Sequence, residues 1–436
     1  MATGSPTTAA ELLGDALAAG LLPPTAETAT DGRLHVGGVA LSDLAERHGT
    51  PAFVIDETGI RDAARAYVAA FTGLHRRVDV HFAFKAFPAP GIAAVFASEG
   101  LGCDVVGANE LALALRGGMP PERILLHGNA KTDADLRAAL DAGIGLVVVD
   151  SFDDIDRLER LATRPQHVLL RINPGVGAST HEAMATGHEA SKFGIPLEQA
   201  DEAIARIRGH RLLELDGLHS HVGSQILDLD PFVSAVAPLG RHGSFDTYDL
   251  GGGLGVRYTL DDPAPPAAAD YARAVVAAVH EHLGEGCRIV LEPGRALVAR
   301  SGVLLYRVVG VKRTPRHTFV SVDGGMGDNL EPMLYGQRFQ PLLLDAGERP
   351  VELCEVVGPH CETGDRLVGT LPLPEPRLGD LVVLPVAGAY CYTMGNNYNG
   401  ALRPPVVLVA GGKERTIVRR ETLDDLLGRH VPASSR

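Results

Sequence analysis

The stretch VDVHFAFK at residues 78–85 begins a series of short apolar runs, each followed by a turn and a helix-like stretch. The runs are rich in Val, Ile and Leu and lack clean polar–apolar alternation, which is typical of strands buried on both faces of a parallel sheet. Seven further runs follow it: LGCDVV (101–106), RILLHG (123–128), GLVVVD (145–150), HVLLRI (167–172), LDGLHSHV (215–222), TYDLGGG (247–253) and RIVLEPG (288–294).

Helix-like stretches separate the runs, as in NELALALRGG (109–118), DADLRAALDAG (133–143) and DDIDRLERLA (153–162). We expect the glycines that close the first two stretches to end helices. Eight strands alternating with helices predict a (β/α)8 TIM barrel, because eight successive units at this spacing favour a closed barrel over a doubly wound open sheet. One connection, NPGVGASTHEAMATGHEASKFGI (173–195), is long enough to indicate an active-site loop.

After about residue 300 the chain changes to short β-like segments such as VLLYRVVGVKR and DLVVLPVAGAY, with turns such as LPLPEPRLGD (371–380) between them. This texture predicts an all-β second domain, which the strand-like RLHVGGVALSDL (33–44) is expected to join. We therefore expect an N-terminal extension with that strand (1–47), a barrel (48–300) and a β domain (301–436). Two domains are also the usual outcome for 436 residues.

The composition narrows the classes of partner. A formal net charge of -14 at pH 7 opposes binding to nucleic acid or to an anionic membrane, and no apolar run approaches the ~20 residues of a membrane span. The first twenty residues have no basic segment ahead of an apolar one, so we expect no signal peptide. The five cysteines form no CxxC pair, which indicates a reduced, cytoplasmic protein.

Lys85 is the first candidate for chemistry, because barrel active sites lie at the C-terminal ends of the strands and Lys85 ends the first run. A lysine there costs free energy unless it is paired, neutralised or covalently used. Partial burial would lower its pKa and free the amine to attack an aldehyde. The alternative is a lysine whose side chain extends to the surface.

His219 and His221 end the run 215–222, and a spacing of two places both on one face of a strand. They could bind a metal, or one imidazole could lie flat against a planar cofactor with Gly223 and Ser224 at its phosphate. A purely structural role is the third reading.

Two further segments end strands. DLGGG (249–253) has three glycines that allow backbone N–H groups to approach an anion, but its order is not the GxGxxG of dinucleotide sites. In EPGR (292–295), Glu292 could bind a protonated pyridine nitrogen and Arg295 a carboxylate or phosphate, unless the two side chains pair with each other.

GPHCETGD (358–365) lies in the expected β domain and places the thiol of Cys361 beside Glu362. An adjacent negative charge raises the pKa of a thiol, so this pattern does not predict an activated nucleophile. A neutral thiol could still donate a proton, and a simple β-turn is the alternative.

Taken in order, these segments resemble the motif series of diaminopimelate decarboxylases. That family belongs to the fold-type III decarboxylases, which use pyridoxal 5'-phosphate, have an alanine-racemase-like fold and include ornithine decarboxylase. The resemblance covers about residues 33 to 425. Its motifs are FAFKAF, HGNAK (127–131), NPGV, SKFGI, HSHVGSQ, DLGGG, EPGR, CETGD and NNYNG (396–400).

The resemblance implies a role for each matching residue. Lys85 would hold the cofactor covalently, His221 would stack on its ring, Glu292 would bind its pyridine nitrogen, and Asp104 would lie nearby. The phosphate would be held by Ser224, Gly251, Gly252, Gly253 and Tyr398. The substrate contacts would be Arg295, Tyr335 and Glu362.

The resemblance also implies α-decarboxylation of an amino acid at a D-configured centre. The electrons of the scissile carboxylate would flow into the cofactor ring as CO2 leaves. Cys361 would then protonate the substrate carbon. Cys361 and Glu362 would act in the active site of the partner subunit, so a homodimer is expected.

One position departs from the family pattern. The family has RPxLYG after an Asp-Asn pair, and that arginine binds the distal carboxylate of diaminopimelate, whereas here DNLEPMLYGQRF (328–339) places Glu331 there. This reversed charge would repel a distal carboxylate and favour an amine. Arg338 or Arg257 are candidates to compensate. We therefore keep open a specialised decarboxylase that acts on another amino acid or an amino-acid conjugate in secondary metabolism.

Three rivals from other classes stay open. A pyridoxal-phosphate racemase would need a tyrosine base opposite the lysine and would release no CO2. A non-catalytic pyridoxal-phosphate-binding protein would be a single barrel, which the β domain argues against. A metal-dependent barrel hydrolase would hold its metal at His219 and His221, whereas the family resemblance implies no metal.

Overall fold

The computed structural model describes residues 8–175 and 191–431. Its internal contacts divide the chain into two units. The first, the barrel unit, comprises Arg61–Val256 and Pro263–Leu297. The second, the β unit, comprises Met1–Ile60, Arg257–Asp262 and Val298–Arg436, so a short segment from within the expected barrel range belongs to it.

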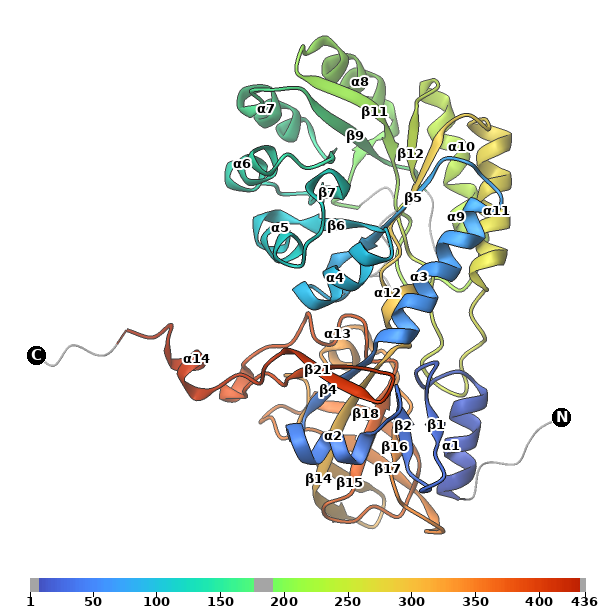
Figure 1. Ribbon diagram of the computed structural model, residues 1–436, viewed down its shortest axis with the longest axis vertical. Coiled ribbons are helices and arrows are strands. Elements are labelled where there is room, and N and C mark those ends of the chain that lie inside the picture. Colours follow the sequence, from blue (N-terminus) through green and yellow to red (C-terminus); the bar gives the residue numbers. More distant parts are fainter. Residues whose placement is uncertain (1–7, 176–190, 432–436) are drawn as a thin grey trace, which may run out of the picture. The chain divides into compact units, whose positions relative to one another are not determined.

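Eight parallel strands of the barrel unit close into a ring (Figure 1), because β13 pairs with β5 and β8 pairs with β9. This confirms the predicted TIM barrel and excludes the open sheet. The strands are β5 (Val78–Ala83), β6 (Gly102–Val106), β7 (Ile124–His127), β8 (Leu146–Val149), β9 (Gln166–Asn173), β11 (Leu213–His219), β12 (Thr247–Asp249) and β13 (Arg288–Leu291). A two-residue strand, β10 (Ile195–Pro196), adds to β9.

Helices follow most barrel strands, and two of them end at the predicted glycines. α5 (Gly107–Arg116) stops before Gly117, and α6 (Asp133–Ala142) stops at Gly143, whose φ of 70° is left-handed. The other helices of this unit are α4 (Pro90–Ser98), α7 (Phe152–Leu161), α8 (Ala200–Gly209), α9 (Asp230–Ser234), α10 (Val236–Leu239) and α11 (Ala268–His282). Two more, α3 (Glu57–Thr72) and α12 (Arg295–Val298), include the residues at which the chain passes between the units.

The barrel core is apolar where the strands contribute branched side chains. Leu125, Leu146, Val148, Leu169 and Val290 form one buried cluster from four strands. Such a core is filled by side chains and is not a channel. The polar groups that carry chemistry therefore gather at the ends of the strands.

The main sheet of the β unit is largely antiparallel and has the order β18-β17-β15-β14-β4-β20-β21, with β19 paired to β14 and β16. Its strands are β4 (Ala52–Asp56), β14 (Gly302–Arg313), β15 (Thr318–Val322), β16 (Leu342–Leu343), β17 (Val351–Val357), β18 (Arg366–Pro374), β19 (Leu381–Pro385), β20 (Val406–Ala410) and β21 (Lys413–Val418). This confirms the predicted all-β texture after residue 300. Its short helices are α13 (Glu331–Tyr335) and α14 (Leu423–Leu427).

The segment 33–44 lies in the β unit, as expected, but its strands are not part of the main sheet. Residues 33–44 contribute β2 (Leu34–Val36) and β3 (Val39–Ala40), which form a separate antiparallel sheet with β1 (Glu27–Thr28). β4 instead lies between β14 and β20. The helices of this region are α1 (Ala9–Ala18) and α2 (Leu41–His48). The AFVID run of β4 is five residues long and buried at every position, whereas β2 and β3 are only three and two residues long and pair with the exposed β1.

Among the described residues, no helix is long and apolar enough to cross a membrane.

Substitution of Gly217 can test the close packing of barrel strands β11 and β12. It pairs with Thr247 between β11 and β12, and a Cβ atom at Gly217 would collide with the carbonyl oxygen of Thr247. We expect Gly217→Ala to lower the free energy of unfolding by about 3 kcal/mol or more, because overpacking against backbone forces the strands apart. Urea denaturation followed by circular dichroism measures this.

The matched control is Gly209→Ala. A Cβ atom at Gly209, the last residue of α8, has nothing within 4 Å. This change is expected to be neutral or to stabilise by up to ~1 kcal/mol. Equal unfolding midpoints for both variants would contradict the close approach.

Candidate active site

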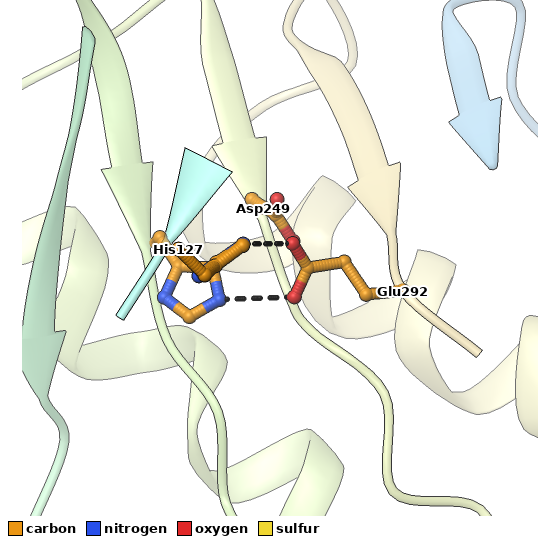
Figure 2. Close-up of side chains that lie close together, drawn as sticks. His127, Asp249 and Glu292 are labelled. Atoms are coloured by element: carbon orange, nitrogen blue, oxygen red, sulfur yellow. Dashed lines mark hydrogen bonds and ion pairs between the residues drawn. The ribbon is translucent and has the colours of Figure 1, made fainter. Parts of the chain in front are cut away.

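Polar side chains from four barrel strands meet at Glu292, which follows β13 and is buried (Figure 2). His127, the last residue of β7, bonds Glu292 Oε1 through Nε2. His219, the last residue of β11, bonds Glu292 Oε2 through Nε2 at 3.2 Å. Asp249 ends β12 beside them. The carboxyl ends of the strands thus supply the cluster, as barrel architecture leads one to expect.

The pKa values of the two carboxyl groups in this cluster are shifted in opposite directions. Burial alone would raise the pKa of Glu292, but its electrostatic interactions and hydrogen bonds with the two imidazoles, His127 and His219, outweigh burial and hold that pKa well below its usual range. Burial, and next the negative charge of Glu292, raise the pKa of Asp249 well above its usual range. The ionised form of Glu292 is therefore stabilised, whereas the shift at Asp249 favours its protonated form.

The two histidines of HSHVGSQ separate in the structure, so the expectation that both lie on one strand face is wrong. β11 ends at His219, and the alternation of a strand does not continue to His221. Burial lowers the pKa of His219 to about 4, so this ring is neutral and donates to Glu292. His221 instead accepts the N–H of Gly252 at Nδ1 (3.2 Å).

His221 is held as a neutral, oriented ring. Its pKa lies well below the usual value because of burial first and then the nearby charges of Lys85 and Arg171. Since Nδ1 accepts a hydrogen bond, the proton of the neutral ring must sit on Nε2. A neutral imidazole with a fixed plane can stack on a flat ligand.

The glycines of DLGGG are required for close approach. A Cβ atom on Gly251 would lie 2.6 Å from Nδ1 of His221, and one on Gly252 would collide with the carbonyl oxygen of Glu292. The N–H of Gly251 donates to Asp249 Oδ1 (2.9 Å), and that of Gly252 donates to His221. Of the three glycine N–H groups that we expected to bind an anion, those of Gly251 and Gly252 thus already donate to protein groups. Gly253 has a φ of 121° and approaches the carbonyl of Gly223.

Lys85 does not end a strand. β5 stops at Ala83, and Lys85 lies in a 3-10 turn (Phe84–Ala86) with its side chain exposed, so the expected partial burial is wrong. Its charge nevertheless acts on the cluster, because it lowers the pKa of His221 and opposes the rise at Asp104. Burial raises the pKa of Asp104, in β6, to about 6.

Arg295 and Ser224 belong to the same unit. Arg295 is buried at the first position of α12, and Ser224 is half-buried beyond β11. Lys85, Asp104, His221, Ser224, Gly251, Gly252, Gly253, Glu292 and Arg295 thus all lie in the barrel unit.

The remaining predicted residues lie in the β unit. Cys361 is exposed, and its N–H donates to Oδ1 of Asn399 (2.9 Å), the residue after Tyr398. The chain places Glu362 next to Cys361. Figure 1 places α13, which Glu331 begins and Tyr335 ends, within this unit.

Glu331 is buried, and both arginines that were proposed to compensate for it already bind other groups. Arg338 forms an ion pair with Asp261 at 2.9 Å. Arg257 donates to the carbonyl oxygens of Leu260 and Asp262. Both arginines that the sequence suggested for the distal-carboxylate role thus already bind other groups.

The sequence interpretation gave no role to His127 or Asp249, although each ends a strand within a quoted motif. The same holds for Lys131 of HGNAK, which is buried and donates to Gly128 O (2.6 Å) and Asp154 Oδ2 (2.7 Å). These bonds fix the turn that follows His127. The rule that strand ends carry the chemistry would have found the first two residues.

The predicted active-site loop 173–195 lies partly outside the described residues, which omit 176–190. Its described C-terminal part is attached to the barrel. The N–H of Gly194 donates to Asp150 Oδ2 (3.1 Å), and the guanidinium of Arg171 lies 4.5 Å from the centre of the Phe193 ring. An ion pair of 3.5 Å joins Arg171 to Asp150.

The donor set around Glu292 can act in two ways. One ligand atom from each of His127, His219, Asp249 and Glu292 lies within 4.8 Å of the others, so these residue types could hold a metal ion. The predicted metal pair of His219 and His221 is not part of that group. Alternatively, the ionised Glu292 can bind the protonated nitrogen of a planar heterocycle beside the neutral ring of His221.

Comparison with known proteins distinguishes these uses. Residues 58–299 match the family model "Pyridoxal-dependent decarboxylase, pyridoxal binding domain". The diaminopimelate decarboxylase of Actinosynnema pretiosum subsp. auranticum is 46% identical over 413 residues, covering 92% of this chain and 93% of that protein. The enzyme of the same name from Bacillus subtilis is 40% identical over 421 residues, covering 92% and 96%.

Solved structures agree with the sequence relatives. The crystal structure of diaminopimelate decarboxylase from M. jannaschii has a TM-score of 0.88 and 30% identity, covering 94% of this chain and 99% of that one. The Helicobacter pylori enzyme in complex with L-lysine has a TM-score of 0.84 and 32% identity, covering 89% and 98%.

The buried neutral histidines give a pH dependence of stability. Burial lowers the pKa of His81 to about 4 in the folded protein, against 6.5 as the ordinary value. Between these values only the unfolded chain binds the proton, so stability falls as the pH falls from about 6.5 to 4. We expect His81→Gln to reduce the slope of unfolding free energy against pH near pH 5 by up to ~1.4 kcal/mol per pH unit. Urea titrations at several pH values measure the slope, and an unchanged slope would contradict the neutral state of His81.

Proposed function

This chain belongs to the diaminopimelate decarboxylase family of pyridoxal-dependent decarboxylases, and from that premise we propose that it converts meso-diaminopimelate to L-lysine and CO2. The observation that carries the proposal is similarity to diaminopimelate decarboxylases over nine-tenths of both chains, at 40–46% identity. Such similarity spans the barrel motifs and the β-unit motifs together.

Three features of the barrel unit support pyridoxal 5'-phosphate as the cofactor. Glu292 is an ionised acceptor, His221 is a neutral ring of fixed orientation, and the glycines 251–253 let the loop after β12 pack directly against His221, Glu292 and Gly223. The cofactor, when bound, accepts the electron pair that remains on the substrate carbon as CO2 leaves. We assign it to the expected barrel domain, 48–300.

Each barrel residue then has a distinct task. Lys85, exposed beyond β5, would attach the cofactor through its amine. Glu292 would hold a proton on the ring nitrogen, because a carboxylate stabilises the charged form of a nitrogen base. His221 would stack on the ring, and Asp104 would lie beside it. We assign the phosphate to Ser224, the glycines 251–253 and Tyr398.

The substrate contacts come from side chains that suit a dicarboxylic amino acid. Arg295 would bind a carboxylate with its planar guanidinium. Tyr335 and Glu362 would contact the remainder of the substrate. The thiol of Cys361 would donate a proton to the carbon from which CO2 has left.

We also propose a homodimer in which Cys361 and Glu362 complete the active site of the partner subunit. The exposed position of Cys361 supports a contact beyond its own subunit. All five cysteines are free thiols, which supports a reducing compartment such as the cytoplasm.

A second candidate substrate is favoured by Glu331. This carboxylate occupies the place of the family's carboxylate-binding arginine, and its negative charge would attract an amine where diaminopimelate carries a carboxylate. The second candidate is therefore decarboxylation of an amino acid or conjugate whose distal group is cationic. It shares the cofactor chemistry of the first and differs only at the distal end.

The substrate prediction is tested by CO2 release from purified protein with pyridoxal 5'-phosphate. We expect release from meso-diaminopimelate, with lysine, ornithine and arginine as parallel candidates. Glu331→Arg and Glu331→Gln are each expected to raise kcat/KM for diaminopimelate by roughly 3- to 10-fold, because removing a like charge stabilises the bound carboxylate by about 1 kcal/mol. The glutamine variant keeps the buried volume and changes only the charge.

Two outcomes would decide against parts of this proposal. If diaminopimelate releases no CO2 although Lys85 demonstrably carries the cofactor, the substrate is another amino acid. A fall in diaminopimelate activity in both Glu331 variants, with activity on the other amino acids retained, would show that Glu331 does not oppose the distal carboxylate.

The shared active site makes a prediction of its own. Lys85→Ala and Cys361→Ala homodimers are each expected to be strongly impaired. Heterodimers formed by co-expression carry one intact site of two, so a statistical mixture should recover about a quarter of wild-type activity. Purification through two different tags isolates the heterodimer, and its failure to release CO2 would place Lys85 and Cys361 in the same subunit's site.

A further inference from the structure

The loop that carries Cys361 and Glu362 connects β17 to β18 and spans residues 358–365. Cys361 is exposed, whereas the other four cysteines are buried. A proton donor at an exposed loop is effective only if the loop is held in place, because small displacements of reacting groups reduce rates steeply. The contacts that hold this loop therefore bear directly on the reaction.

Asp365, the last residue of the loop, is buried and holds two segments at once. Its Oδ2 accepts the N–H of His360 (2.8 Å) within the loop. Its Oδ1 accepts the N–H of Met326 (2.7 Å) from the segment after β15. Hydrogen bonds to a charged acceptor are stronger than neutral ones, so one carboxylate joins the two segments firmly.

Two glycines make room for this carboxylate. A Cβ atom on Gly358 or on Gly325 would collide with the carboxylate oxygens of Asp365. Gly358 lies in the loop and Gly325 lies in the segment after β15, so each of the two segments passes close to the carboxylate at a glycine. A side chain at either glycine would therefore displace the carboxylate of Asp365.

A third segment joins the same cluster. Oδ1 of Asn399 accepts the N–H of Cys361 (2.9 Å), and Nε2 of His360 accepts the N–H of Gly327 (3.2 Å). Asn399 has a φ of 54°, in the left-handed region that asparagine tolerates better than most residues. Asn396 closes the triangle through its N–H to the carbonyl of Gly327 (2.9 Å). The segments 325–327, 358–365 and 396–399 thus form one connected cluster, the three-loop cluster.

We propose that Asp365 is a positioning residue for decarboxylation: through the three-loop cluster it fixes the loop that presents Cys361 and Glu362. The inference rests on the function proposed above, which gives those two residues their roles. Asp365 itself acts only through its neighbours. Without this carboxylate the loop keeps its bonds to Asn399 and Gly327 but loses both bonds that Asp365 accepts.

The test uses the holoenzyme with Asp365→Asn, and Asp380→Asn as a matched control. Asp380 is a β-unit carboxylate that binds Arg349 (2.7 and 3.1 Å) and the N–H of Arg377 (2.8 Å), away from the three-loop cluster. The first readout is the rate at which iodoacetamide alkylates Cys361, which the burial of the other four thiols isolates. The second is the separation of kcat from KM in CO2 release.

We expect Asp365→Asn to alkylate at least about 5-fold faster and to lose about 10-fold or more in kcat with KM within about 2-fold. Asp380→Asn is expected to change thermal stability without either effect. Asn399→Ala removes the acceptor for Cys361 and places alanine at a left-handed φ that it tolerates less well, so it should change both readouts in the same direction by less than Asp365→Asn. Asn399→Asp keeps both the acceptor and the tolerance for this φ, and should restore the readouts. These Asn399 variants keep the proposal testable if Asp365→Asn does not fold.

A wild-type alkylation rate in Asp365→Asn and Asn399→Ala would overturn the proposal. So would faster alkylation with an unchanged kcat, since the loop would then be loosened without consequence for the reaction. The alkylation arm needs no substrate. A failure of diaminopimelate as substrate would therefore leave that arm intact, and kcat would be measured on whichever amino acid releases CO2.

Discussion

The charge on the buried carboxylate of Glu292 is the constraint on which the rest of the active site depends. An ionised carboxylate taken out of water costs several kcal/mol unless partners offset it, and here two imidazoles bind its two oxygens. Burial, and next this negative charge, raise the pKa of Asp249 well above its usual range. The site thus combines a stabilised anion at Glu292 with a carboxyl group whose protonated form is favoured.

This constraint reaches the backbone through glycine. The carbonyl of Glu292 and the ring of His221 both press against the loop after β12, where Gly252 and Gly251 have no Cβ to collide with them. The N–H of Gly252 then fixes the plane of His221 and keeps Nδ1 as an acceptor. The glycine-rich motif therefore shapes the site as much by letting two side chains converge as by offering donors to an anion.

The sequence predicted the barrel well because burial on both faces leaves a plain signal: each of the eight apolar runs overlaps a barrel strand. It located the motifs for the same reason, since they end those runs. The sequence interpretation failed for residues whose side-chain position depends on where a strand ends. Lys85 lies beyond β5 in an exposed turn, and His221 lies beyond β11. It also missed His127 and Lys131, whose importance comes from partners that are distant in the chain, Glu292 and Asp154.

The two units hold their functional loops by different means. In the barrel, side chains from separate strands bind Glu292, so the charge state of each partner matters. In the β unit, Asp365 accepts hydrogen bonds from backbone N–H groups, which do not depend on the side chains of the donor residues. Substitution can therefore disturb this contact only at the glycines that lie beside the carboxylate. The barrel cluster should thus tune the chemistry, whereas the three-loop cluster fixes geometry alone. That division suits a reaction in which one residue must hold a charge and another must deliver a proton from a set direction.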